Sequence, residues 1–127
     1  MIRRACGLAL LILACWARPA SAACTVSTTS VAFGAYDVFA STAADSTGLV
    51  SVFCNSRTTV TVQVGKGSAP TFLPRTMKQA AAPLTYNLFQ DNARSTVWGD
   101  GTGGSAAFSA TINANTTRNQ TIYGRVP

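Results

Sequence analysis

The segment from Leu84 to Gly104, LTYNLFQDNARSTVWGDGTGG, constrains the fold of this chain more than any other stretch. Its first six residues alternate as an extended strand does, and one face carries Leu84, Tyr86 and Leu88. Asp91-Asn92 ends that strand and a short aromatic strand follows. Asp100-Gly101 is a dipeptide that supplies the positive φ angles of a tight hairpin turn. The segment therefore predicts β structure throughout.

The rest of the chain also alternates with a period of two residues. Besides residues 84–89, we expect strands over residues 31–36, 49–54, 59–64, 75–79, 106–112 and 121–126. The side chains expected to face inward are Val50, Val52, Cys54, Val60, Val62 and Val64. Pro74 and Pro83 flank residues 75–79, which indicates an edge strand. Short strands separated by turns predict an all-β, immunoglobulin-like β-sandwich.

Three further side chains and the last strand complete this prediction. In residues 121–126, Ile122, Gly124 and Val126 share one face, and Tyr123 and Arg125 lie on the other. Phe72, Met77 and Trp98 are the side chains that could be exposed on the surface for a function. Core packing is the favoured interpretation for Trp98, and Phe72 and Met77 are expected to cover an edge of the sandwich.

The first 22 residues have the features of an export signal. Two arginines precede an apolar stretch that is too short to span a bilayer, and Ala20-Ser21-Ala22 offers a small-residue cleavage site. We expect cleavage between Ala22 and Ala23, a single domain over residues 23–127, and no transmembrane segment in the mature chain. An alternative is that Cys15 is lipidated.

Removal of the signal changes both the charge and the cysteine count. Three of the ten basic residues lie in the signal, so seven remain against four aspartates, and the scattered cations do not form a nucleic-acid footprint. They are expected on solvated strand faces. Cys24 and Cys54 are the two cysteines left, and export to an oxidising compartment predicts a disulfide between them. This bond would tie the first strand to the strand that follows it.

The residue types argue against an enzyme and against a cofactor or metal site. The chain has no histidine and no glutamate, and each of its four aspartates is expected to cap a turn: Asp37, Asp45, Asp91 and Asp100. Asp91 and Asp100 lack the spaced acidic ligands of a calcium loop. Residues 99–104 resemble a phosphate-binding loop only superficially, because a strand and not a helix is expected to follow them.

The central segment resembles a signature of the spore coat protein U domain family, which includes subunits of archaic chaperone–usher pili. The matching residues are Tyr86, Leu88, Phe89, Asp91, Ala93, Arg94, Trp98, Gly99, Asp100, Gly101, Thr102 and Gly103. The resemblance implies a structural or adhesive subunit of an extracellular pilus, secreted through the periplasm. Its partners would be a periplasmic chaperone, an outer-membrane usher and other pilus subunits, which complete the sandwich by strand addition. No nucleic acid is expected as a partner.

Two departures from the family pattern modify this expectation. Only Ala23 precedes Cys24 after the expected cleavage, where pilin-type members have an apolar donor arm, and the chain stops at Pro127, where members usually continue into a final strand. We therefore expect a C-terminally truncated, incomplete sandwich, which could be the N-terminal part of a tip adhesin. The alternatives are a free-standing secreted or surface-coat protein and, less favoured, a carbohydrate-binding module.

Overall fold

The computed structural model describes residues 21–127, so most of the expected export signal, with Cys6 and Cys15, lies outside the described residues. Within them the chain is all β and contains no helix. The seven strands are β1 (Cys24–Thr29), β2 (Ala44–Cys54), β3 (Thr58–Val62), β4 (Arg75–Gln79), β5 (Ala82–Phe89), β6 (Phe108–Ile112) and β7 (Thr116–Val126).

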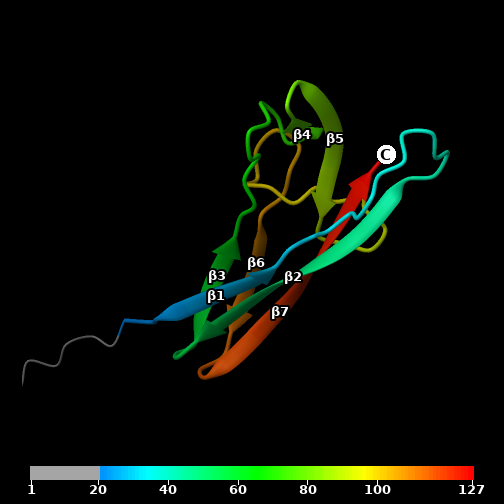
Figure 1. The fold of residues 1–127 in the computed structure, drawn as a ribbon. Helices are drawn as coiled ribbons and strands as arrows, with labels where there is room; N and C mark the ends of the chain where they lie inside the picture. Colours follow the sequence, from blue (N-terminus) through cyan, green and yellow to red (C-terminus); the bar gives the residue numbers. More distant parts are fainter. Residues whose placement is uncertain (1–20) are drawn as a thin grey trace, which may run out of the picture.

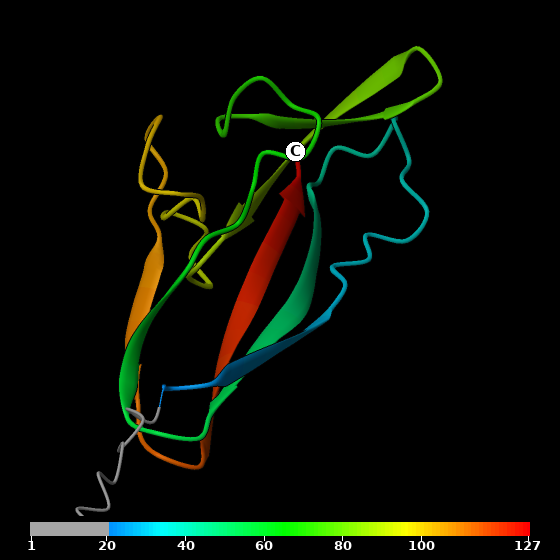
Figure 2. The same ribbon diagram turned by 90° about the vertical axis from the view of Figure 1, so that its left-hand side faces the viewer.

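The strands form two antiparallel sheets that face each other (Figures 1 and 2). The large sheet has the order β1-β2-β7-β5-β4, and the small sheet consists of β3 and β6. Two short turns at the lower end of Figure 1 connect the layers, one from β2 to β3 and one from β6 to β7. This arrangement is a β-sandwich, as the alternation predicts, and it is incomplete, as the departures from the family pattern led us to expect.

The long β2–β7 pair forms the centre of the large sheet. Val50, Val52 and Cys54 of β2 face the small sheet, as predicted, and so does Ile122 of β7. Val60 and Val62 of β3 cover them from the opposite layer. The buried core consists of Val50, Val52, Cys54, Trp98, Ile112 and Ile122.

The disulfide between Cys24 and Cys54 is present and joins β1 to β2, as predicted. The two cysteines are direct partners in the antiparallel register, at the end of the ladder where β1 begins. Asn55 next to it accepts a hydrogen bond from the Ala23 amide at 2.9 Å and donates its own amide to the Ala23 carbonyl at 3.1 Å. The start of β1 is therefore fastened to the β2–β3 turn both covalently and by hydrogen bonds.

Several predicted strands differ from those observed. β2 and β7 extend further toward their N-terminal ends than the alternating patterns indicated, since polar residues of both strands continue the ladder. β4 has the predicted bounds and lies at an edge of the large sheet. The prediction of a strand over residues 31–36 is wrong, because the first strand is β1 and residues 30–36 run outside any strand.

Candidate functional site

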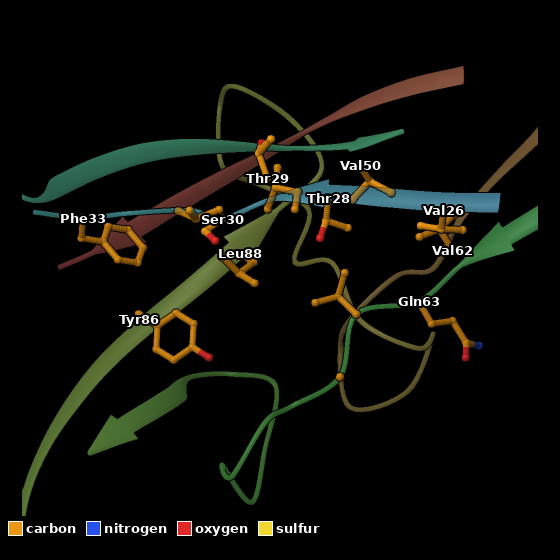
Figure 3. Close-up of a pocket in the computed structure, with 14 residues that line it drawn as sticks. Val26, Thr28, Thr29, Ser30, Phe33, Val50, Val62, Gln63, Tyr86 and Leu88 are labelled. Atoms are coloured by element: carbon orange, nitrogen blue, oxygen red, sulfur yellow. The ribbon is translucent and has the colours of Figure 1, made fainter. Parts of the chain in front are cut away.

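A groove of about 510 Å³ opens between the edge of the large sheet and the edge of the small sheet (Figure 3). Val26 and Thr28 of β1 line one wall, and Val62 with the following Val64 lines the opposite wall. The floor is formed by three apolar residues of the large sheet, which are Val50, Leu88 and Ile122. None of the fourteen lining residues is charged.

Both walls of the groove are strand edges. In the described part of the chain, β1 pairs only with β2 and β3 pairs only with β6. All six residues of β1 are exposed. Val26 is 61% exposed although it faces the same side of the sheet as its register partner Val52, which is 4% exposed. The apolar interior is therefore open to solvent along this side.

One end of the groove, the end beyond Ser30, is closed by the chain that follows β1. Residues 30–33 leave the sheet edge and cross its inner face, where Val31 and Phe33 lie directly on two glycines. A Cβ atom on Gly48 would come within 2.7 Å of the Thr29 carbonyl oxygen, and one on Gly124 within 2.6 Å of Val31 Cγ1. The crossing therefore depends on the two glycines, which leave the inner face of β2 and β7 flat. This close approach is the physical reason why the predicted strand over residues 31–36 does not form.

The crossing segment reaches the far side of the groove through an aromatic contact. The ring of Phe33 meets the ring of Tyr86 from β5 edge to face, with centroids 6.4 Å apart. Ser46 Oγ donates a hydrogen bond to the Ala32 carbonyl at 2.6 Å and holds the crossing segment in place. In Figure 3, Phe33 and Tyr86 lie at one end of the groove and Val26 and Gln63 at the other.

Arg75 of β4 supports the groove wall from behind and is fully buried. Its Nε donates to the Gly65 carbonyl at 3.0 Å, and its Nη2 donates to the Val64 carbonyl at 3.2 Å. The guanidinium also donates to the Trp98 carbonyl and to Asn87 Oδ1, the latter at 2.8 Å. Burial lowers the pKa of Arg75, and only neutral oxygens accept its hydrogen bonds.

Arg75 and Phe72 correct two predictions. Arg75 was expected on a solvated strand face, but its guanidinium is enclosed by carbonyl groups of three segments. Phe72 was expected to cover an edge, yet it is buried, with the Arg75 guanidinium 5.1 Å and the Lys66 ammonium 5.3 Å from its ring centroid. Both cations lie within the distance at which a cation is attracted to an aromatic ring. Met77 is half-buried on β4.

Trp98 links the groove wall to its floor and is fully buried, as predicted. Its indole Nε1 donates to the Val62 carbonyl at 3.0 Å, and its backbone amide donates to the Leu88 carbonyl at 2.9 Å. Its ring packs edge to face on Phe108, with centroids 5.8 Å apart. The signature tryptophan thus contacts β3 and β6 through its side chain and β5 through its backbone amide.

The first loop of the signature, residues 90–96, is organised by Asp91. This residue follows the end of β5, where the sequence predicted that the strand would end. Its carboxylate accepts hydrogen bonds from the amides of Ser95 and Thr96 and from the Ser95 hydroxyl, at 2.8 to 3.2 Å. These bonds lower the pKa of Asp91 from its ordinary value of 3.8 to about 2. Arg94 sits at the tight point of the loop with a φ of 56°.

The second loop of the signature, residues 99–105, is a turn that is capped by the side chain of Asp100. It is not the predicted hairpin. Asp100 Oδ1 accepts hydrogen bonds from the Thr102 hydroxyl at 2.6 Å and the Thr102 amide at 2.9 Å, and these bonds lower the Asp100 pKa. Gly101 and Gly103 supply positive φ angles of 92° and 58°. The pairing across the loop is a single parallel bridge between Trp98 and Ala106, which no antiparallel hairpin can make.

Asp45 also departs from its predicted place beside a turn. It lies in β2, opposite Arg125 of β7, and its two oxygens accept hydrogen bonds from Arg125 at 2.7 and 2.8 Å. Arg94 Nε lies 3.3 Å from the same carboxylate, and its guanidinium lies 5.8 Å from the Tyr123 ring centroid. The hydrogen bond from Arg125 is the main cause that lowers the pKa of Asp45. This cluster joins the first signature loop to the outer face of β2 and β7.

The signature residues therefore separate into two groups. Tyr86 and Leu88 line the groove and Trp98 packs behind it. The other signature residues do not line it: Phe89, Asp91, Ala93, Arg94, Gly99, Asp100, Gly101, Thr102 and Gly103. The predicted cleavage residues Ala22 and Ala23 lie exposed before β1. Sequence reasoning missed Arg75, Phe33 and the pair Gly48 and Gly124. The two strand-interior glycines were the available signal, since such glycines often mark a close backbone approach.

Neither a metal centre nor a membrane-spanning helix is found among residues 21–127. No group of three or more candidate ligand side chains is close enough there to hold a metal ion. No helix in that range is long and apolar enough to cross a membrane. The groove between β1 and β3 is lined by uncharged and mainly apolar side chains.

The geometry can be set beside the comparison with known protein families. A family model described as Spore Coat Protein U domain matches residues 14–127. No curated protein matches the chain.

Proposed function

Because the chain belongs to the spore coat protein U domain family, a family of structural pilus and coat proteins, we propose that it is a structural or adhesive subunit of an extracellular pilus. In this proposal the sandwich is completed by a strand from another polypeptide, first from a periplasmic chaperone and then from a neighbouring subunit. An outer-membrane usher would export the assembled subunits to the cell surface.

The observation that carries the proposal is the apolar groove between two unpaired strand edges. A strand edge presents backbone amide and carbonyl groups without a β partner, and an added strand can pair with them along its whole length. The side chains of such a strand alternate in direction, so every second one would enter the groove and cover Val50, Leu88 and Ile122. A small ligand could fill the groove but would leave the edges unpaired.

The exposure of the β1 wall supports the same proposal. Val26 exposes 61% of its surface, although it lies on the side of the sheet that carries the core. An apolar side chain stabilises the protein only when it is removed from water, so covering Val26 with an added strand would be favourable. The disulfide at the start of β1 supports export into an oxidising compartment such as the periplasm. The expected export signal over residues 1–22 belongs to the same proposal.

Photo-cross-linking at the groove rim tests this function. A photoreactive amino acid in place of Val26 would be compared, in the source bacterium, with one in place of Phe53, a partly exposed residue on the outer face of β2. We expect position 26 to cross-link an extended segment of a chaperone or a pilus subunit, identified by mass spectrometry, and position 53 to do so much less. Equal cross-linking at both positions, or none to assembly proteins, would favour a free-standing coat protein.

A further inference from the structure

We infer that the groove accepts an extended segment through three successive inward-facing apolar side chains, and that the Phe33–Tyr86 contact sets where this segment ends. The inference rests on the proposed function and specifies the partner and its register. It assigns Phe33 and Tyr86 the role of specificity-determining residues.

The number three follows from the β1 wall. Val26 and Thr28 face the inner side of the sheet, like their register partners Val52 and Val50, and both line the groove. Ser30, two residues further on, continues this alternation and lines the groove as well, and Thr29 between them adds to the lining. After Ser30 the chain leaves the edge and crosses over Gly48 and Gly124, so the wall ends there. Three alternate side chains of an incoming strand span about 13 Å, which is the length of this wall from Val26 to Ser30.

The end of the groove is a closed barrier. Val31 and Phe33 fill the space above the two glycines, and the Phe33 ring reaches across to the Tyr86 ring of β5 (Figure 3). A fourth inward side chain would have to occupy the position of the Phe33 ring. The opposite end, beside the exposed Val26, carries no such barrier.

The chemistry of the inward side chains follows from the lining. All fourteen lining residues are uncharged, and the floor consists of aliphatic side chains. A charged side chain on the inward face would lose its hydration without gaining an ionic partner. The three inward residues are therefore apolar and neutral, whereas the outward residues remain in solvent and are free to be polar.

Binding of synthetic peptides tests the inference. The probes are nonapeptides with polar outward residues and either three or four consecutive inward valines, and a scrambled peptide serves as reference. With the full chain secreted in its oxidised form, we expect the three-valine peptide to bind and the fourth valine to change the affinity less than twofold. In Phe33→Ala, the space left by the ring should accept the fourth valine and raise the affinity for that peptide about tenfold.

Control variants separate the effect of the Phe33–Tyr86 contact on the bound segment from effects on folding and from the proposed function. Phe53→Ala, on the outer face of β2, should bind both peptides as the unmodified chain does. Phe33→Val also removes the ring but keeps an aliphatic side chain over Gly124, so it should raise the affinity for the four-valine peptide in the same direction and replaces Phe33→Ala if that variant folds poorly. A tenfold gain from the fourth valine in the unmodified chain, or no gain from it in a folded Phe33→Ala or Phe33→Val variant, overturns the inference. If neither valine peptide binds better than the scrambled one, strand addition itself is refuted.

Discussion

Arg75 is a buried side chain that fixes the position of one wall of the groove. Its guanidinium holds the carbonyl groups of Val64 and Gly65, which form the groove wall, to Trp98 and Asn87. A guanidinium can donate five hydrogen bonds in a fixed plane, and no other side chain can reproduce this set.

Replacement of Arg75 should therefore be among the most destabilising changes in the chain. Arg75→Met leaves several buried carbonyl oxygens without donors, and we expect a loss of about 3–5 kcal/mol in the free energy of unfolding. Arg75→Lys should recover only part of it, because an ammonium cannot reach all four acceptors. Urea denaturation measures both, with Arg57→Lys on the exposed β2–β3 turn as control. A small effect of Arg75→Met would show that water replaces the guanidinium.

Asp91 predicts a defined pH dependence. Hydrogen bonds from Ser95 and Thr96 hold its folded-state pKa near 2, below its ordinary value of 3.8. Because the folded-state pKa is the lower one, the stabilisation is complete above about pH 4 and is lost as the pH falls toward 2. The stability difference between the unmodified chain and Asp91→Asn should shrink over this interval. Urea midpoints at pH 6, 4, 3 and 2 measure it, and a difference independent of pH would contradict the assignment.

At the level of elements, the crossing of residues 30–33 is the feature that shapes the groove. The Cβ of Gly48→Ala would approach the Thr29 carbonyl oxygen, which is backbone, whereas the Cβ of Gly124→Ala would meet the ends of the Val31 and Phe33 side chains. Side-chain ends can rotate away more easily than backbone can. We expect Gly48→Ala to cost about 2–3 kcal/mol and Gly124→Ala about 1 kcal/mol. An equal or reversed order in urea denaturation would mean that the crossing is not fixed by β2.

Strand β1 is held by pairing along one edge and by the disulfide at its start. All of its side chains are exposed, so packing contributes little to its position. On the chain-entropy model, closing the loop between Cys24 and Cys54 contributes about 3.7 kcal/mol. Cys24→Ser with Cys54→Ser should lose most of this free energy, and hydrogen exchange of the β2 amides that face β1 should accelerate. Unchanged exchange in β2 would show that β1 stays in place through its hydrogen bonds alone.

The elements that the sequence predicted well are those whose alternation is local. The inward faces of β2 and β3, the edge position of β4 and the disulfide follow from period-two patterns and from the cysteine count. Residues 31–36 have the same strand-like composition, but their path depends on glycines in β2 and β7 that are distant in sequence. The burial of Arg75 depends on carbonyl groups of three other segments. Local periodicity carries no information about such contacts, and the groove is built mainly from them.

At the scale of the whole molecule, the two sheets enclose a core that is open along the groove between β1 and β3. Val26 is exposed at the open side, and the edges of β1 and β3 lie along it. A sandwich with this opening gains stability when a further strand enters, because binding to the folded state alone shifts the folding equilibrium. The same opening exposes apolar surface that favours self-association of the isolated chain.

Hydrogen exchange of the oxidised, full-length chain tests the central claim most directly, with and without a saturating three-valine peptide. For the chain alone, we expect rapid exchange of the amides on the unpaired edges of β1 and β3, which point away from β2 and β6. The peptide should slow their exchange at least tenfold and leave the β4–β5 hairpin unchanged. Amides of β1 and β3 that are already protected in the chain alone, or that remain unaffected by the peptide, would contradict the account of a sandwich completed by an added strand.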